Sequence, residues 1–365
     1  MDVSNDRQKA LERVLEALER AECVLLTTHI NADGDGCGSE VAAAAWLRAR
    51  GTPAWIVNPT PYPDTYRFLV PDPAWVIDAA GPDVRRVAGE ADTALVLDTG
   101  EVPRIGRVKP LTDGKVIVVV DHHPPGERPI EGVELRAPEA CATGELVHDL
   151  IRLAGGPWPR AAVDALYVAV LTDTGGFRFS NATAACHRVT ADLIERGADP
   201  ERLYREVYGS LPLNRLRLLR HALATLEVDD EGRVAWMTVP PDAFQALELV
   251  PEDLEGIVDY PRAVEGVEVG LLFRTTVGGG TKVSFRSNGE VDVNALARQF
   301  GGGGHVRAAG ALIEGPLEEV RPRVIEATRR AVRETLGPVA RAAARREPEP
   351  GPVEAGSPPR KDDEP

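Results

Sequence analysis

The fold is decided by the stretch Cys23-Val24-Leu25-Leu26-Thr27-Thr28-His29-Ile30-Asn31-Ala32-Asp33-Gly34-Asp35, in which an apolar run leads directly into polar side chains. The run at residues 23–28 is short, and a short run of this kind is typical of a buried strand. His29, Asp33 and Asp35 follow it at once, and Gly34 keeps the backbone between the two carboxylates close and exposed. The stretch therefore predicts a strand that ends in side chains able to bind a ligand.

The same arrangement recurs twice further along the chain. Ala94–Leu97 leads into Asp98, and Val116–Val120 leads into Asp121. Helical patterns such as Ser39–Arg50 lie between these runs. Short apolar runs that alternate with helices predict an α/β fold, with a mainly parallel sheet flanked by helices on both faces. Ligands of such sheets bind beyond the carboxyl ends of the strands, so the polar clusters should converge there.

The chain of 365 residues is long enough for two domains and a tail. We expect a catalytic α/β domain at residues 1–200, a helical connection at 201–220, a smaller α/β domain at 221–337 and a disordered tail at 338–365. The tail is rich in Pro, Ala, Arg and Glu, and such a composition cannot repay the entropy of ordering.

Further elements can be predicted within these domains. Helices are expected at 6–21, 144–153, 161–172, 293–300 and 317–336, and strands of the second domain at 234–239, 267–276 and 282–286. The glycines at 278–280 predict a hairpin turn between the last two strands.

Composition narrows the class of protein. The net charge of −15 favours a small anionic substrate over long nucleic acid, because proteins that grip long nucleic acid usually present a basic face. The four cysteines show no CxxC spacing, which argues against a disulfide framework and a zinc finger. The sequence has no apolar span of membrane length and does not open with the pattern of a signal peptide, so we expect a cytoplasmic protein without membrane contact.

The polar clusters of the first domain form a set of metal-ligand residue types. The set is His29, Asp33, Asp35, Asp98, Asp121, His122, His123 and Asp173. Carboxylates with imidazoles and no thiolate suit Mn²⁺, Mg²⁺ or Fe²⁺ better than structural Zn²⁺. So many carboxylates in one cleft would repel one another without cations. These residues fall into four clusters, at 29–35, 98–100, 121–123 and 173–175. Each cluster alone could be an ordinary turn or helix cap. All four in this order predict a site for two divalent cations that promotes phosphoryl displacement.

These motifs resemble the DHH phosphoesterase superfamily over roughly residues 10–335, and within it the branch of bifunctional oligoribonucleases and pAp phosphatases. The family usually has Pro and Ala around Asp-Gly-Asp, where this chain has Ala32 and Gly36. The resemblance implies two divalent cations, foremost Mn²⁺, with Mg²⁺ and Fe²⁺ as alternatives. It implies that one cation is held by His29 and Asp33 and the other by Asp35, His122 and Asp173.

The resemblance also implies catalytic roles. Asp98 would bridge both cations. His123 would face the substrate phosphate, as a ligand or as the proton donor to the leaving oxygen. Asp121 would orient a neighbouring histidine.

The second domain carries a glycine run, Gly301–Gly304, followed by His305. Backbone N–H groups of consecutive glycines can converge on an anion, although such a run can also be a flexible linker. The run resembles the signature of the substrate-binding DHHA1 domain. With that resemblance, we expect substrate contacts from Arg286, Ser287, Gly302, Gly303, Gly304, His305, Arg262 and Arg178. Exposure on an edge strand for Arg286, and packing at a helix start for Arg178, are the structural alternatives.

The implied activity is hydrolysis of short oligonucleotides to mononucleotides and of pAp to AMP. The resemblance also allows a homodimer. A phosphodiesterase for linear or cyclic dinucleotides (pApA or c-di-AMP) is an alternative, although such enzymes are typically membrane-tethered. A RecJ-like exonuclease usually has an added nucleic-acid-binding domain, and family II pyrophosphatases lack the glycine–histidine signature. A non-catalytic nucleotide sensor would be expected to have lost a metal ligand, whereas all six ligand positions are filled.

Overall fold

The computed structural model describes residues 5–209, 213–239, 254, 256–276 and 279–338. The chain divides into two compact units, Met1–Ser210 and Leu211–Pro365. The division falls inside the predicted helical connection at 201–220. The expected tail lies outside the described residues except for position 338. Position 278 of the expected hairpin turn also lies outside them. None of the described helices is both long and apolar enough to cross a membrane.

The N-terminal unit is built on a five-stranded parallel sheet with the order β2-β1-β3-β4-β5. The strands are β1 Val24–Thr27, β2 Ala54–Ile56, β3 Thr93–Leu97, β4 Val116–Asp121 and β5 Val133–Arg136. Strands β1 and β3 are buried at every position, which explains their uniformly apolar sequences. The predicted α/β class with a mainly parallel sheet is confirmed.

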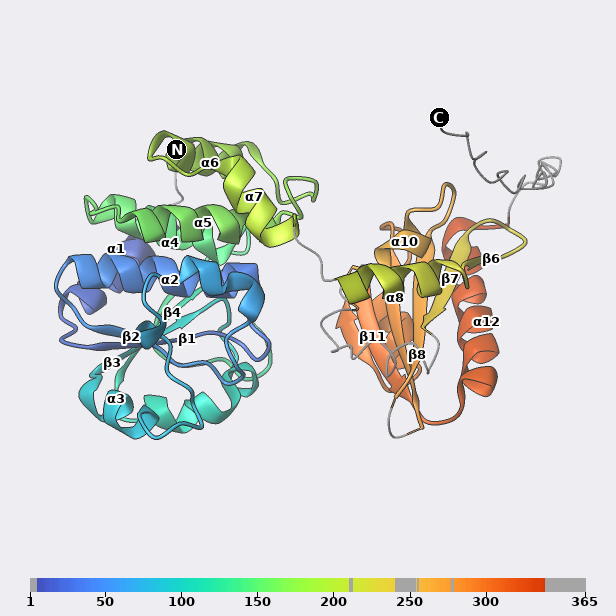
Figure 1. Ribbon diagram of the computed structural model, residues 1–365, viewed down its shortest axis with the longest axis horizontal. Coiled ribbons are helices and arrows are strands. Elements are labelled where there is room, and N and C mark those ends of the chain that lie inside the picture. Colours follow the sequence, from blue (N-terminus) through green and yellow to red (C-terminus); the bar gives the residue numbers. More distant parts are fainter. Residues whose placement is uncertain (1–4, 210–212, 240–253, 255, 277–278, 339–365) are drawn as a thin grey trace, which may run out of the picture. The chain divides into compact units, whose positions relative to one another are not determined.

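Helices cover both faces of this sheet (Figure 1). One face packs against α1 Asn5–Glu19, α2 Gly34–Ala49, α4 Thr143–Leu153 and α5 Arg160–Asp173. The other face packs against α3 Val84–Glu90 and the 3₁₀ segment η3 Val102–Thr112. Two shorter 3₁₀ segments, η1 Asp64–Leu69 and η2 Pro73–Trp75, follow β2, and α6 Ala184–Glu195 and α7 Pro200–Tyr208 complete the unit.

The strand order creates a switch point between β1 and β3. The chain leaves β1 for β2 on one side and then crosses to β3 on the other side. The chain leaves these two strands toward opposite faces of the sheet, to α2 and to η3, and open α/β sheets bind ligands at such a point. His29 follows β1 and Asp98 follows β3, so both lie at this switch point.

Helix α2 begins at Gly34, five residues before the predicted Ser39, because Asp33 caps it. An Asp33 carboxylate oxygen accepts hydrogen bonds from the N–H groups of Asp35 and Gly36, at 3.0 and 3.1 Å. The helix packs very closely on α5: a Cβ at Gly38 would lie 2.5 Å from the carbonyl oxygen of Ala165. Capping and close packing together fix the start of α2 beside the strand ends.

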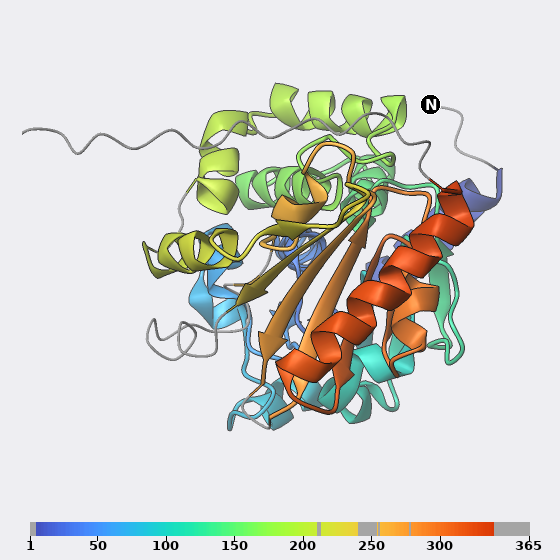
Figure 2. The ribbon, with the colours of Figure 1, turned by 90° about the vertical axis from the view of Figure 1, so that its right-hand side faces the viewer.

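The C-terminal unit contains a six-stranded sheet with the order β10-β11-β9-β8-β7-β6. Its strands are β6 Glu227–Val228, β7 Val234–Val239, β8 Val269–Thr275, β9 Thr281–Ser287, β10 Gly303–His305 and β11 Ala308–Ile313. Only the pair β7 and β8 is parallel. Helices α11 Val293–Arg298 and α12 Leu317–Leu336 pack on one face of the sheet (Figure 2), and α8 Leu213–Leu223 and α10 Asp259–Arg262 pack on strands β7 and β8. The described part of this unit is the predicted smaller α/β domain.

Candidate metal centre

Side chains from five elements converge at the carboxyl ends of β1, β3 and β4. Groups of three side chains, each offering a ligand atom within 4.8 Å of the others, are His29–Asp33–Asp98, Asp35–His122–Asp173 and Asp98–His122–His123. Asp98 and His122 each belong to two groups, so the three groups form one continuous cluster, which we call the metal cluster. The structure thus brings together all six residues predicted as metal ligands, and His123 with them.

The charges in the metal cluster call for a cation. Asp35 and Asp98 are each only 1% exposed. Burial, and then the charges of neighbouring aspartates, raise the pKa of the Asp98 carboxyl well above its usual range, and burial likewise raises the pKa of Asp35. Burial with the charge of Asp35 raises the pKa of Asp173 to about 7. Such crowding is costly unless positive charge compensates it.

The surroundings of the His29 imidazole also favour a bound cation. Its Nε2 atom is buried and has no hydrogen-bond partner within the described part of the chain. It lies 3.2 Å from Asp98 Oδ2 and 3.7 Å from Asp33 Oδ2. Although burial lowers it, the neighbouring carboxylates of Asp33 and Asp98 raise the pKa of His29 to about 10. A buried imidazole nitrogen aimed at two carboxylates is the donor set of a metal ion, so these residues fit a divalent cation.

The start of α4 holds two of the carboxylates in place. The N–H groups of Thr143 and Gly144 donate to Asp35 Oδ2 and Oδ1, at 2.6 and 2.9 Å. The Thr143 hydroxyl donates to Asp98 Oδ1 at 3.0 Å. Sequence analysis did not identify Thr143; the signal for it was the helix start at Ala142-Thr143-Gly144, whose free N–H groups attract anions.

Asp98 occupies an unusual backbone conformation, with φ = +58°. A residue with a side chain adopts this region at a cost of about 1 kcal/mol. Its N–H still donates to the carbonyl oxygen of Val120 at 3.0 Å, which ties the turn after β3 to β4. Strain of this kind persists where the surroundings fix a side chain for function.

Of the two neighbouring histidines, His123 is the one that the Asp121 carboxylate contacts. His123 Nδ1 lies 2.8 Å from Asp121 Oδ1, and the His123 N–H donates to the same oxygen at 3.0 Å. Arg136 donates to Asp121 Oδ2 at 2.9 Å. Although burial raises it, the hydrogen bonds from His123 and the charges of His123 and Arg136 lower the pKa of Asp121 below its usual value.

Asp173 and the loop that follows it are fastened by Asn181. The Asn181 amide donates to Asp173 Oδ2 at 3.2 Å, to the carbonyl oxygen of Asp173 at 3.1 Å and to the carbonyl oxygen of Cys141 at 2.9 Å. Arg178, predicted to contact substrate, lies exposed in this loop, and its Nε donates to the carbonyl oxygen of Gly175 at 2.6 Å. Arg178 therefore lies within the segment next to a metal-cluster residue.

The second half of the glycine run, together with His305, lies in a strand of the C-terminal unit. Gly303–His305 is β10, which pairs antiparallel with β11 at the edge of the sheet. The two strands approach closely, since a Cβ at Gly304 would lie 2.5 Å from the carbonyl oxygen of Ala308. Gly303, Gly304 and His305 are all exposed.

The other predicted substrate residues differ in their surroundings. Arg286 follows the core residue Phe285 on β9, so its side chain leaves the sheet on the face opposite to α11 and α12. Ser287 is buried, and its hydroxyl donates to Glu268 Oε1 at 3.1 Å, so this hydroxyl serves the unit itself. Arg262 is half-buried and lies 3.2 Å from Asp259.

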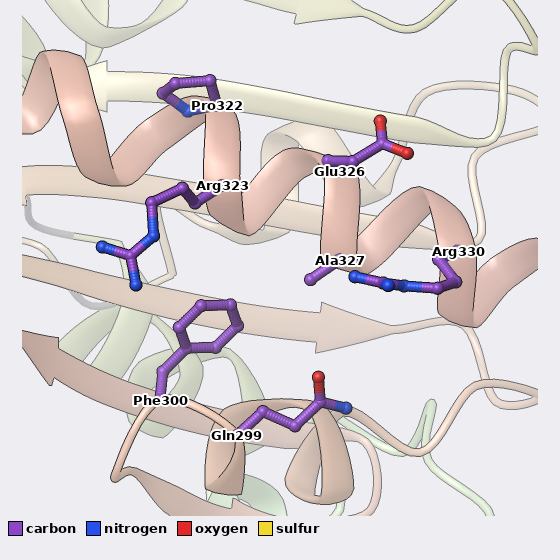
Figure 3. Close-up of a pocket in the computed structure, with 7 residues that line it drawn as sticks. All are labelled: Gln299, Phe300, Pro322, Arg323, Glu326, Ala327 and Arg330. Carbon is purple, nitrogen blue, oxygen red and sulfur yellow. The ribbon is translucent and has the colours of Figure 1, made fainter.

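A shallow hollow of about 580 Å³ lies between α11 and α12 (Figure 3). It is lined by Gln299, Phe300, Pro322, Arg323, Glu326, Ala327 and Arg330. None of the predicted substrate residues lines it, and it lies on the face of the sheet covered by α11 and α12, opposite to Arg286. We therefore separate this hollow from the predicted substrate contacts.

Both units match models of known protein families. The DHH family model, described as its N-terminal domain, matches residues 23–170, and the DHHA1 domain model matches residues 243–334. A Thermus thermophilus protein described as the bifunctional oligoribonuclease and PAP phosphatase NrnA is 33% identical over 327 residues, which cover 89% of this chain and 94% of that protein.

Two solved structures share the fold. An exopolyphosphatase-related protein from Bacteroides fragilis matches with a TM-score of 0.81 at 24% identity, over 90% of this chain and 96% of that chain. RecJ from Thermus thermophilus, solved in complex with Mn²⁺, matches with a TM-score of 0.51 at 15% identity. That match covers 89% of this chain but 55% of RecJ.

Proposed function

This chain belongs to the DHH family, in the branch of bifunctional oligoribonucleases and PAP phosphatases, and from that premise we propose that it is a two-metal hydrolase that degrades short oligonucleotides to mononucleotides and converts pAp to AMP. The observation that carries the proposal is the continuity of the metal cluster. One group, His29, Asp33 and Asp98, shares Asp98 with its neighbour, so two cations can be held side by side. Paired cations clamp the attacking and leaving oxygens of a phosphoryl displacement.

The proposed ligands divide as the three-residue groups do. We assign one cation to His29 and Asp33 and the other to Asp35, His122 and Asp173, with Asp98 between them. Carboxylate-rich sites with imidazole suit Mn²⁺, which is therefore the proposed ion, with Mg²⁺ or Fe²⁺ as alternatives. Bound cations supply polarisation of the phosphate and activation of a water molecule.

The remaining residues act on the substrate directly. His123 is proposed to donate a proton to the leaving oxygen, because Asp121 engages its Nδ1 and leaves Nε2 for the substrate. The start of α4 keeps the Asp35 and Asp98 carboxylates fixed as charge moves during the reaction. Arg286 and the exposed strand Gly303–His305 are the proposed contacts for the rest of the nucleotide, with phosphate bound by the guanidinium group.

The test is a substrate panel with the purified chain and Mn²⁺. We expect rapid turnover of pAp and of 5′-phosphorylated di- to pentanucleotides, and little turnover of a long single strand or of pyrophosphate. The Asp98→Asn variant is the control for contaminating nucleases. Preference for the long strand or for pyrophosphate would leave the metal cluster standing and refute the proposed substrates.

A further inference from the structure

Arg136 is the last residue of strand β5, at the carboxyl end of the sheet, where the metal cluster lies. In the register of β4 and β5 it lies directly opposite Asp121. Its side chain is 10% exposed, and Nη1 donates both to Asp121 Oδ2 at 2.9 Å and to the carbonyl oxygen of His123 at 3.0 Å. The Nε group donates to Glu134 Oε1 at 2.7 Å, and this second contact restrains the orientation of the guanidinium group. Arg136 thus contacts both partners of the Asp121–His123 pair and is itself held.

His123 is consequently fastened at three points. Its N–H and its Nδ1 atom contact Asp121 Oδ1, and its carbonyl oxygen accepts from Arg136. The ring is held through Nδ1, and the side chain keeps 30% of its surface exposed. Asp121, at 1% exposure, is a buried carboxylate, and a buried carboxylate without a cation beside it is costly. Arg136 supplies that cation at Asp121 Oδ2 and contacts His123 at its carbonyl oxygen.

The turn after β3 makes room for this contact. A Cβ at Gly100 would overlap the Arg136 guanidinium, so a residue with a side chain could not stand there without displacing it. Gly100 follows Asp98 by two residues. The guanidinium therefore packs against the same turn that carries the proposed bridging ligand, and the turn is shaped to admit it.

We propose that Arg136 is a positioning residue for hydrolysis, which holds the Asp121–His123 pair so that His123 Nε2 points at the leaving oxygen. The inference rests on the proposed function. In the step concerned, the oxygen of water bonds to phosphorus and the P–O bond to the leaving group breaks. The Nε2 proton passes to the leaving oxygen, and the proton released by water restores the imidazole. Arg136 transfers no proton; it acts through Asp121 and the His123 backbone.

The test compares two leaving groups. An ordinary nucleotide ester, such as pAp or a 5′-phosphorylated dinucleotide, expels an alkoxide that needs a proton. A p-nitrophenyl nucleotide ester expels a phenolate that needs little help. We expect Arg136→Ala to lower kcat on the nucleotide ester by about 100-fold, as loss of general acid catalysis does, and kcat on the aryl ester by a much smaller factor. Arg136→Lys should recover part of the nucleotide activity.

Controls separate positioning from folding. Arg7 is matched to Arg136, because its side chain is also 10% exposed and is paired with two buried carboxylates, Glu145 and Asp149. Arg7→Ala should affect both esters equally. The double variant Arg136→Ala with His123→Ala should be no slower on the nucleotide ester than His123→Ala alone, because both changes remove the same proton transfer.

Several outcomes would overturn the proposal: equal losses on both esters for Arg136→Ala, the same leaving-group dependence for Arg7→Ala, or additive losses in the double variant. If Arg136→Ala does not fold, Arg136→Lys decides alone, since equal losses of kcat on the two esters would refute a positioning role. Failure of the wild-type chain to hydrolyse either ester would instead refute the proposed function.

Discussion

The two candidate regions of the molecule present their polar groups in opposite ways. In the metal cluster, Asp35 and Asp98 are buried and held by the N–H groups and hydroxyl at the start of α4. In the C-terminal unit, Gly303, Gly304 and His305 are exposed on an edge strand. Buried, mutually repelling carboxylates keep a fixed geometry for charge that appears during a reaction. An exposed backbone edge suits recognition of a ligand that arrives and leaves.

The difference predicts which measurements each region should change. Changes in the metal cluster should lower kcat, because the interactions there act on the transition state. Changes in the C-terminal region should raise KM, because they remove binding that substrate and transition state share.

The largest effect is expected for Asp98→Asn. The amide keeps the shape of the side chain and tolerates φ = +58°, while the proposed bridging charge is lost. We expect kcat to fall by roughly 1,000-fold or more, a loss at the upper end for groups that act on transition-state charge. The metal-free protein should unfold at an equal or higher temperature, because crowding with Asp35 is relieved.

The control for this prediction is Asp192→Asn. Asp192 pairs with His148 and Arg196 within the same unit, so its loss should lower stability and leave kcat unchanged. Steady-state kinetics, metal titration and thermal unfolding check the set. An Asp98→Asn protein that still binds two cations and keeps a tenth of its turnover would contradict the division.

A smaller effect, on KM, is expected for Arg286→Ala. Its side chain leaves β9 on the face opposite to α11 and α12, and loss of a charged hydrogen bond to phosphate should raise KM about 10- to 100-fold while kcat changes little. Arg333→Ala is the matched control, since Arg333 is paired with Glu231. A collapse of kcat at constant KM would show that the C-terminal region takes part in the chemical step.

The sequence predicted the centre of this picture because each cluster of predicted ligands follows an apolar run or a helical stretch. His29 and Asp98 lie where strands end, so the parallel sheet alone brings them together. The residues that hold them could not be found in this way. Thr143 and Asp35 are 108 positions apart and meet only through packing of α4 on α2. Arg136 reads as an ordinary strand residue until its register with Asp121 is known.

The glycine run shows a different limit. Consecutive glycines at 301–304 permit many conformations, so local sequence could not choose between a loop and a strand. The choice is made by β11, whose residues Ala308, Ala309 and Gly310 are small enough for the two strands to approach closely. The tertiary partner, rather than the run itself, decides the structure.

The smallest effect is expected for Glu40→Gln, which leaves the ligands in place and replaces a carboxyl group buried on α2. Glu40 is fully buried, and burial, opposed by a hydrogen bond from Asn58, raises its pKa to about 8 from an ordinary value of 4.5. The folded chain then holds a proton that the unfolded chain has lost. The free energy of unfolding should therefore be greatest below pH 4.5 as far as Glu40 is concerned, and should fall as the pH rises through about 8.

Glu40→Gln should remove this part of the decline and stabilise the metal-free protein at pH 9 by about 1 to 3 kcal/mol, with kcat nearly unchanged. Urea unfolding from pH 5 to pH 9 checks it, with the exposed Glu12→Gln as control. A wild-type slope that Glu40→Gln leaves intact would mean that the carboxyl of Glu40 is ionised in the folded protein, and that the charge buried behind the metal cluster is larger than its geometry suggests.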